Sequence, residues 1–401
     1  MGRLRLLTGG ESHGPAVTAI LEGLPAGLPL DRAAIDAWLA RRQHGYGRGG
    51  RQRIERDRVV VTGGLRGGVT LGSPLVLSIA NRDFENWTGA MDPWTVDPGE
   101  VERVRRTAPR PGHADFSGAA ALDRVEDLRD VLERASARET AARVAAGAVA
   151  AQLLGRYGIA IRSGVLEVGG AVVSEGPPDW ELLGGVDPES PLVTPRPAEE
   201  ERLKEVVRAA RDAGDTLGGV VGAVVRGLPP GLGSHTHWDR RLDGRIAQAL
   251  VSIPSVKAAA IGAGIETARR PGSEAHDPFF PGPAGTLGRP TNRAGGLEGG
   301  VTNGEDLVVR AWFKPIATLR RGLPTVDLAS GEPVVSAWER SDTTAVASAP
   351  VIVESMLALV LAGALLETLG GWAIADVDAG WRTLTGRIAR WWRPADPEAR
   401  G

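Results

Sequence analysis

The spacing of apolar residues along the chain predicts a mixed α and β protein. Alternating or continuous runs rich in β-branched residues predict strands at residues 4–8, 58–81, 159–173, 217–228 and 305–314. Apolar residues at helical spacing predict helices at residues 31–43, 126–158, 198–213, 241–253 and 349–369. Asp31 is the expected N-cap of the first helix, and Gly155 and Gly158 are expected to end the second. The proline-marked residues 82–121 are expected to be irregular, and the glycines within 58–81 predict a hairpin.

These segments follow one another without a stretch that has the composition of a flexible linker. Although 401 residues could form two or three domains, we therefore expect one large α+β domain over residues 1–380. A basic tail that carries tryptophans, residues 381–401, is expected to pack on the surface or at a subunit contact. The most apolar stretch, residues 355–366, has twelve residues, well short of the roughly 20 that a membrane span needs. It predicts a buried core helix.

Composition and charge exclude several kinds of chemistry. The chain has no cysteine, which excludes disulfides, thiolate catalysis and cysteine-ligated metal sites. Its net charge of −2 gives no support to a nucleic-acid partner. The N-terminus lacks the apolar core of a signal peptide, so a soluble cytoplasmic protein is expected. Only three of the 47 cationic residues are lysines and only six residues are histidines. A lysine or a loop histidine is therefore more informative here than an arginine.

Two glycine-containing loops each carry a histidine. In TGGESHGPA, residues 8–16, Ser12 stands beside His13 and could be a nucleophile with its base, part of a phosphate cradle, or part of a tight turn. Sequence adjacency does not decide between these, because a Ser–His pair works only with the right geometry in space. In residues 107–118, His113 follows a Pro-Gly turn and precedes Asp115. A rigid loop could hold a cationic imidazole against a leaving oxyanion, or the histidine could simply cap the turn.

Several basic segments suit an anionic ligand. Residues 41–53 contain five arginines and one aromatic residue, which fits a small anion or, by charge alone, RNA. Arg134 and Arg138, four apart, could form a solvated, salt-bridged helix face, or Arg134 and Ser136 could grip a phosphate. His235 and His237 could bind a metal, but no third ligand of comparable quality is present.

Taken in order, these segments resemble the chorismate synthase family. The likeness runs from residue 3 to about residue 366 and is carried by GESHGPA, RRQHGYGRGGR, RPGHADFSG, ERASARETAARVAAGA, GDTLGGVV, GLGSHTHWDRRLDG, TNRAGGLEGGVTNGE, KPIATL and RSDTTAV. The resemblance implies a β-α-β sandwich with helices between antiparallel sheets, and a homotetramer. It implies a shikimate-pathway lyase that converts 5-enolpyruvylshikimate 3-phosphate to chorismate and phosphate by 1,4-anti elimination. The family requires reduced FMN, and whether NADPH serves as its reductant is left open.

The resemblance also implies roles for individual residues. The expected catalytic residues are His13, His113, Asp342, Ser12 and Ser136. One histidine is expected to protonate the flavin near N1 and the other to lie by the substrate phosphate, with His113 favoured for the flavin, while Asp342 matches an aspartate near the flavin N5. Flavin contacts are implied for Arg134, Ala135, Ser136, Pro254, Ser255, Gly299, Lys314, Pro315, Ile316, Ala317, Thr318 and Arg340. Substrate or nicotinamide-nucleotide contacts are implied for Arg42, Arg48 and Arg110, and no metal is expected.

Two other classes of function remain as alternatives. A polyanion-binding protein that uses residues 41–53 would bind with a steep dependence on salt and without a flavin. A serine hydrolase built on Ser12 and His13 would be expected to show a G-x-S-x-G elbow, which the sequence lacks. The cluster of arginines instead suits a substrate with two carboxylates and a phosphate, because forked guanidinium donors can bind so much charge without a metal.

Overall fold

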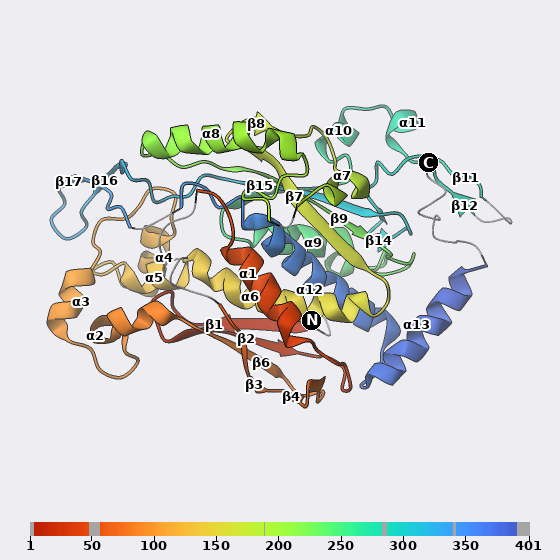
Figure 1. Ribbon diagram of the computed structural model, residues 1–401, viewed down its shortest axis with the longest axis horizontal. Helices are drawn as coiled ribbons and strands as arrows, with labels where there is room; N and C mark the ends of the chain where they lie inside the picture. Colours follow the sequence, from red (N-terminus) through yellow and green to blue (C-terminus); the bar gives the residue numbers. More distant parts are fainter. Residues whose placement is uncertain (1–3, 48–56, 188, 283–286, 340–341, 391–401) are drawn as a thin grey trace.

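The computed structural model describes residues 4–47, 57–187, 189–282, 287–339 and 342–390. Three layers lie on top of one another: a four-stranded sheet, a layer of helices and a five-stranded sheet (Figure 1). The first sheet has the strand order β1 (Arg5–Gly9), β2 (Ala16–Glu22), β6 (Leu75–Ala80) and β3 (Val60–Gly63). The second has the order β10 (Val256–Ile261), β15 (Leu307–Phe313), β9 (Gly219–Arg226), β7 (Ala160–Val168) and β8 (Ala171–Val172).

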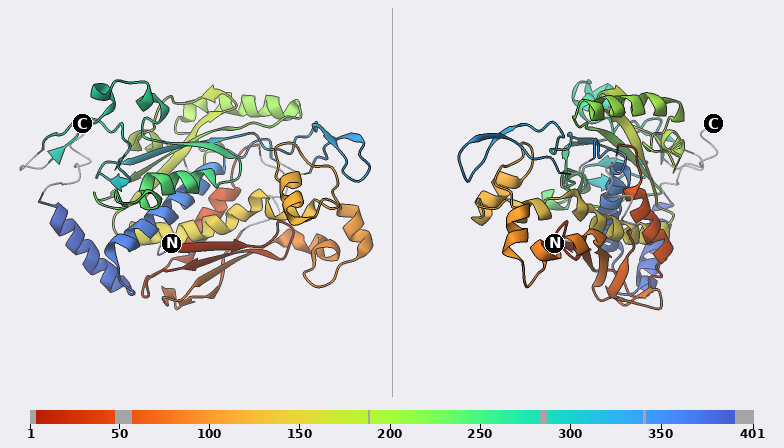
Figure 2. Two further views of the ribbon diagram at one scale, coloured as in Figure 1. Left: turned by 180° about the vertical axis from the view of Figure 1, so that it is seen from behind. Right: turned by 60° about the vertical axis from the view of Figure 1, so that its left-hand side comes forward.

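All neighbouring strands in both sheets pair antiparallel. The helices between the sheets are α1 (Arg32–Gln43), α6 (Thr140–Gly155), α9 (Leu242–Val251) and α12 (Ala349–Leu369), and α8 (Glu200–Asp212) covers the outer face of the second sheet (Figures 1 and 2). This arrangement confirms the predicted α+β class and the β-α-β sandwich. The predicted hairpin is confirmed as β3 paired with β6, with the small β4 (Leu65–Arg66) and β5 (Val69–Thr70) pair between them.

Alternation along the strands explains why the first sheet covers the helix layer. In β2 the side chains of Val17, Ala19 and Leu21 are buried while those between them are less so, and β6 repeats the pattern. Strand β9 is buried on both faces because α7 (Trp180–Gly184) packs on the outside of its sheet, where Leu183 joins Val220 and Val224 in a second apolar cluster. The apolar face of each sheet therefore meets the same helices, and one core fills the space between them.

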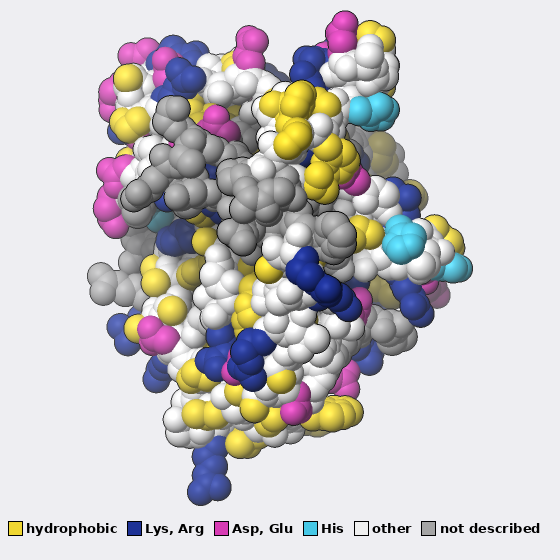
Figure 3. Space-filling view, turned by 90° about the vertical axis from the view of Figure 1, so that its right-hand side faces the viewer, with side chains coloured by type: hydrophobic (Ala, Val, Ile, Leu, Met, Phe, Trp, Pro, Cys, Tyr) yellow, Lys and Arg dark blue, Asp and Glu magenta, His cyan; other side chains and the backbone are white. Residues whose placement is uncertain are grey.

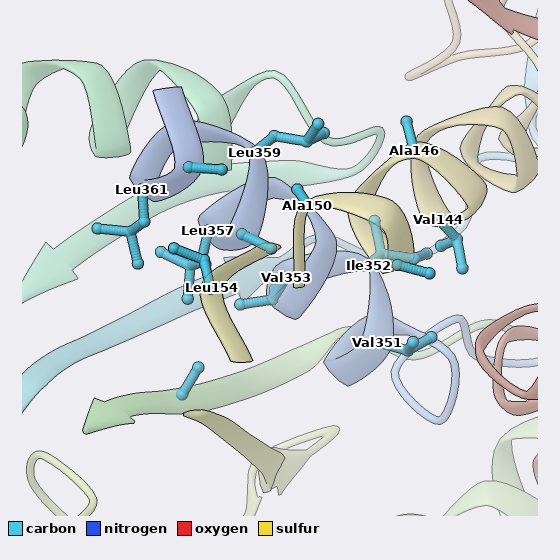
Figure 4. Close-up of a cluster of buried hydrophobic side chains, with 14 of the residues drawn as sticks. Val144, Ala146, Ala150, Leu154, Val351, Ile352, Val353, Leu357, Leu359 and Leu361 are labelled. Atoms are coloured by element: carbon cyan, nitrogen blue, oxygen red, sulfur yellow. The ribbon is translucent and has the colours of Figure 1, made fainter. Parts of the chain in front are cut away.

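The centre of the core is the crossing of α6 and α12. Their Val, Leu, Ile and Ala side chains interdigitate in Figure 4, and both helices are buried along most of their length. Helix α12 is long and apolar enough to cross a membrane, but it is mostly buried between the sheets. This confirms the predicted core helix. The close approach requires a glycine in α6, because a Cβ at Gly147 would stand 2.3 Å from the Cβ of Ser355.

Two predictions about secondary structure were wrong. Residues 82–121 are not irregular but form the 3-10 helix η2 (Arg82–Asn86) and helices α2 (Thr88–Met91), α3 (Pro98–Val104) and α4 (Asp115–Leu122). These elements are too short to show a helical period, although Asp97 caps α3 and Pro98 begins it. The helix predicted for residues 126–158 is broken into α5 (Arg129–Arg134), η3 (Ala137–Glu139) and α6. The break lies at Ser136, whose backbone is extended and whose hydroxyl accepts a hydrogen bond from the Arg138 N–H.

The remaining elements lie at the ends of the sandwich. Helix α13 (Ile374–Ile388) follows α12, and its Trp381 ring contacts Tyr157 at the end of α6 with ring centroids 4.9 Å apart. The boundary expected after residue 380 falls inside this helix, and the division into a domain and a tail stays a prediction. Short hairpins and helices complete the chain: α10 (Ile265–Ala268), α11 (Gly272–Ala275), η4 (Pro197–Glu199), η5 (Trp238–Arg240), β11–β12 (Phe280–Pro281, Leu287–Gly288), β13–β14 (Leu297–Glu298, Val301–Thr302) and β16–β17 (Pro324–Val326, Pro333–Val335).

Candidate active site

The loop that carries Ser12 and His13 joins β1 to β2 and is fixed by a buried amide. The Asn81 side chain, at the end of β6, donates to the carbonyl oxygens of Glu11 and Gly14 at 3.0 and 2.7 Å. Asn81 is itself held by Arg138, whose Nε donates to Asn81 Oδ1 at 2.8 Å and whose Nη1 bonds both Asp57 oxygens at 2.8 Å. Arg138 is 6% exposed. The prediction of a solvated face at Arg134 and Arg138 is therefore wrong for Arg138. The helix is interrupted at Ser136, and the Arg138 side chain consequently points into the core.

His13 lies on a buried carboxylate. Its Nδ1 is 2.8 Å from Glu133 Oε1, and its backbone N–H donates to Glu133 Oε2 at 2.7 Å. The ring stacks on Trp87 with centroids 4.0 Å apart and an interplanar angle of 25°. On the other side of Glu133, Arg129 Nη1 donates to Oε1 at 3.3 Å. Burial of Glu133 opposes its ionisation, but the hydrogen bonds from His13 and the charge of Arg129 outweigh burial and lower its pKa.

The two predicted serines face each other. The Ser136 hydroxyl donates to Ser12 Oγ at 3.1 Å, and the Ser12 backbone N–H donates to the Glu133 carbonyl at 3.2 Å. His13 Nδ1 faces Glu133, whereas Ser12 Oγ faces Ser136. The adjacent Ser12 and His13 side chains thus have different partners, an arrangement unlike the hydrogen-bonded nucleophile and base of a serine hydrolase.

His113 is held in the same way as His13. Its Nδ1 is 2.6 Å from Oδ1 of Asp115 at the start of α4, and 3.1 Å from Arg110 Nη2. A carboxylate only accepts, so the shorter contact with Asp115 assigns a proton to Nδ1, and the longer contact with Arg110 is then not a hydrogen bond. Arg110 also bonds both Asp115 oxygens and Thr318 Oγ1. Burial opposes ionisation of Asp115, but the hydrogen bonds and charges of Arg110 and His113 prevail and hold its pKa well below the usual range.

The predicted flavin segment at residues 314–318 lies against the His113 loop. Lys314 Nζ donates to the Gly112 carbonyl at 2.8 Å, and Thr318 Oγ1 accepts from Arg110 at 3.1 Å. The Lys314 backbone N–H donates to the Ser255 carbonyl, which ties in the Pro254–Ser255 segment at 2.8 Å. Ser255 has φ +75°, a left-handed conformation that is uncommon for serine. Burial, and then the charge of Lys257, lower the pKa of the Lys314 ammonium.

The other predicted residues are placed as follows. Arg134 is exposed beside the His13 loop and donates to the Thr8 carbonyl at 3.0 Å and to Thr8 Oγ1 at 2.8 Å, while Ala135 is half-buried next to it. Gly299 forms the exposed turn between β13 and β14 with φ +59° and open space around it. Pro315 is exposed, whereas Ile316 and Ala317 are half-buried.

Of the other predicted residues, Arg42 lies in α1 and Asp342 lies just before Thr343. Arg42 is 7% exposed and donates to Thr140 Oγ1 and to the Ala137 carbonyl, each at 2.8 Å. Asp342 precedes Thr343, whose backbone bonds Gly47 and Leu217. The predicted contacts at Arg48 and Arg340 lie outside the described residues.

A chain of ion pairs leads from Glu133, the partner of His13, to Arg106. Arg129, which contacts Glu133, also contacts Glu339 Oε1 at 3.0 Å, and Arg106 contacts the same oxygen at 3.1 Å. Arg106 begins the segment that leads to the His113 loop. Helix α4 follows the His113 loop, and α5 carries Glu133. The two helices lie side by side at one end of the sandwich (Figure 1). The structure thus links segments that are far apart in the sequence at one end of the molecule.

The loop with His235 and His237 is part of a different surface. His237 Nδ1 is 2.7 Å from Asp239 Oδ1, and both side chains are more than half exposed. Histidine side chains are visible at the surface in Figure 3, with acidic and basic groups around them. Within the described part of the chain, no group of three or more His, Asp or Glu side chains is placed to hold a metal ion.

Sequence reasoning missed the partners of His13. The sequence pattern did not mark Glu133, Trp87, Arg129 or Asn81 as partners of this histidine. Their signal is weak in the sequence, because each becomes meaningful only when β6, η2 and α5 come together around the loop. Asp115, two residues after His113, was noted but not assigned a role.

Comparison with known proteins identifies the class. The family model described as chorismate synthase matches residues 4–366. A chorismate synthase of Moorella thermoacetica is 54% identical over 370 residues, which span 92% of this chain and 94% of that protein. A chorismate synthase of Thermus thermophilus is also 54% identical, over 93% of this chain and 96% of that protein. A crystal structure of chorismate synthase superimposes with a TM-score of 0.77 at 38% identity, covering 97% of this chain and 99% of that one.

Fold, site and matches together define a carbon–oxygen lyase that acts on a phosphorylated substrate. Within this class, the chain belongs to the chorismate synthase family, which confirms the family predicted from the sequence. Its activity is the 1,4-anti elimination of phosphate from 5-enolpyruvylshikimate 3-phosphate, which gives chorismate in the shikimate pathway of aromatic amino acid biosynthesis. Its substrate is a small anion, and the family uses a flavin cofactor.

Proposed function

We propose that the elimination takes place beside His13 and His113 with reduced FMN as the flavin. The observation that carries this proposal is the matching environment of the two histidines: each Nδ1 lies on a buried carboxylate, Glu133 or Asp115, at 2.8 or 2.6 Å. An imidazole that donates its Nδ1 proton to a carboxylate has Nε2 left for a reacting molecule. The two histidines are thus equipped to hold or deliver a proton at Nε2.

His113 is proposed to act near N1 of the flavin and His13 near the substrate phosphate. In this assignment Asp342 accepts the proton that the substrate loses, and Ser12 and Ser136 orient the groups around His13 through their mutual hydrogen bond. A histidine cation beside the phosphate stabilises the charge that develops as the C–O bond breaks. When bound, reduced FMN supplies electron density to the substrate as phosphate leaves.

The donors around Lys314 fit a flavin phosphate. The lowered pKa of the Lys314 ammonium, caused by burial and then by Lys257, marks a place where positive charge lacks compensation. A phosphate dianion would supply that compensation. The left-handed Ser255 beside it is the kind of strained backbone that clusters at ligand sites. We propose that the FMN is held by Arg134, Ala135, Ser136, Pro254, Ser255, Gly299, Lys314 to Thr318, and Arg340.

Forked arginine donors are proposed to bind the substrate, which carries about four negative charges from two carboxylates and a phosphate. The proposed set is Arg42, Arg48 and Arg110, with NADPH as a candidate source of reducing equivalents. We further propose that the protein is a soluble, cytoplasmic homotetramer.

The test of this proposal separates flavin binding from turnover. The variant His113→Ala should bind oxidised FMN nearly as well as the wild type but lose a factor of about 10²–10⁴ in turnover, the usual contribution of a general acid. His276→Ala, which removes an exposed histidine at the end of α11, is the matched control and should retain full turnover. Wild-type turnover in His113→Ala would refute the proposed role.

A further inference from the structure

Glu133 is a buried carboxylate for which the proposed mechanism states no role of its own. We propose that Glu133 is a positioning residue for His13, and that with Arg129 and Trp87 it fixes which ring nitrogen carries the proton and how the ring is oriented. This inference rests on the proposed function of His13. It assigns to α5 a part in the reaction that the sequence did not indicate.

The contacts of Glu133 are all with donors. Its two oxygens receive the His13 backbone N–H at 2.7 Å, face His13 Nδ1 at 2.8 and 3.0 Å, and accept from Arg129 Nη1 at 3.3 Å. The carboxylate side chain is fully buried, with 0% exposure. A carboxylate with two oxygens can serve all three donors, and in doing so it requires that His13 carry a proton on Nδ1. In this tautomer Nε2 is the basic nitrogen of the ring.

Trp87 and Arg129 complete a closed cluster around the ring. Trp87 stacks on the His13 imidazole with centroids 4.0 Å apart, and the Arg129 guanidinium lies 5.4 Å from the centroid of the Trp87 ring. Arg129 is fixed in turn by the Val104 carbonyl at 2.7 Å and by Glu339 at 3.0 Å. The imidazole is thus held at its edge by Glu133 and on one face by Trp87, so its rotation is restricted.

Arg129 lies behind Glu133 and also pairs with Glu339. Removing either the Glu133 carboxylate or the Arg129 guanidinium should therefore change how the His13 ring is held.

The experiment compares Glu133→Gln, Glu133→Asp and Arg129→Gln by the pH dependence of kcat. In Glu133→Gln the pH profile of kcat should change, with kcat reduced about 10–100-fold, the usual effect of losing an orienting partner, and KM changed little. Glutamine does not replace the carboxylate because it offers one acceptor oxygen to three donors. Glu133→Asp, which keeps the charge, should recover most of the activity. Arg129→Gln removes a donor from Glu133 and should also change the profile, so the proposal can be tested even if Glu133→Gln does not fold.

A second readout does not depend on turnover. With only six histidines in the chain, ¹⁵N-histidine labelling can report the His13 tautomer in the resting protein, with the signal assigned by its loss in His13→Ala. The wild type should carry the proton on Nδ1, and Glu133→Gln should show a mixture of tautomers. The control Asp378→Asn removes a carboxylate that pairs with Arg156 and Tyr157 on another part of the protein, and it should leave both the tautomer and the pH profile unchanged.

The outcomes are distinguishable. An unchanged tautomer and pH profile in Glu133→Gln would overturn the positioning role, even if the variant were less stable or slower. Full turnover in His13→Ala would instead overturn the proposed function of His13. In that case the tautomer measurement would still report whether Glu133 controls the ring.

Discussion

Replacing Gly147 by alanine should force α6 and α12 apart at the centre of the sandwich. A Cβ at this position would stand 2.3 Å from Ser355 Cβ and 2.4 Å from Ser355 Cα, whereas ordinary contact begins at 3.4 Å. The obstacle is the backbone of α12, which a rotamer change does not move. The helices would have to separate by roughly 1 Å, in a core that is packed as densely as an organic crystal.

The expected loss of stability follows from two opposed effects. Overpacking a core costs about 1–3 kcal/mol, and alanine is favoured over glycine inside a helix by about 1 kcal/mol. Because the clash involves backbone, we expect the cost to prevail by about 1–2 kcal/mol, which in a protein of this size lowers the unfolding temperature by roughly 2–4 °C.

The matched control lies in the same helix. Gly155 ends α6, and a Cβ there would meet no atom within 4 Å, so Gly155→Ala should raise the unfolding temperature slightly or leave it unchanged. Thermal unfolding of the two variants and the wild type, followed by circular dichroism at one protein concentration, measures the difference. If Gly147→Ala were as stable as Gly155→Ala, the proposed contact between the two helices would be wrong.

Two further predictions concern the His113 loop and the flavin segment. Because the folded pKa of Asp115 lies below its unfolded value of about 3.9, its stabilising effect is present above about pH 4 and is lost as the pH falls further. Asp115→Asn should therefore lower the unfolding temperature most near neutral pH. If the difference in unfolding temperature between the variant and the wild type did not become smaller below about pH 4, this reasoning would be contradicted. Lys314→Met should weaken FMN binding about 10–100-fold in a fluorescence titration, since a hydrogen bond to a charged group contributes about 1.5–3 kcal/mol. Lys204→Met, on the outside of α8, is its control, and equal affinities would exclude Lys314 as a flavin ligand.

Helix caps and long apolar runs were predicted correctly, because they depend on residues that are close together in the sequence. Asp31 caps α1 through the Ala33 N–H at 2.8 Å, as expected from its position before the helix. The apolar run at residues 349–369 forms α12 with the predicted bounds. By contrast, β10 was not predicted, because its Lys257 and three alanines have little strand preference and become a strand by pairing with β15.

In the candidate site, too, some features were predicted from local sequence and others depend on the tertiary fold. The two histidine loops were identified from rare residues in glycine-rich and proline-rich segments. The environment of His13 depends on contacts across long stretches of sequence, such as Glu133 with His13 and Arg138 with Asn81. The alanine-rich sequence of residues 126–158 is locally helical, and the break at Ser136 is stabilised by partners on β6 and on the loop after β1. Such contacts are decided by the tertiary fold, and the local pattern does not contain them.

The most direct measurement of the central claim is an anaerobic assay of the purified protein with 5-enolpyruvylshikimate 3-phosphate. Formation of chorismate and release of phosphate are followed with reduced FMN, with oxidised FMN, with no flavin, and with FMN and NADPH as the only reductant. The account predicts that one phosphate is released for each chorismate formed and that turnover requires reduced FMN. Turnover without any flavin, or no phosphate release with reduced FMN present, would contradict it.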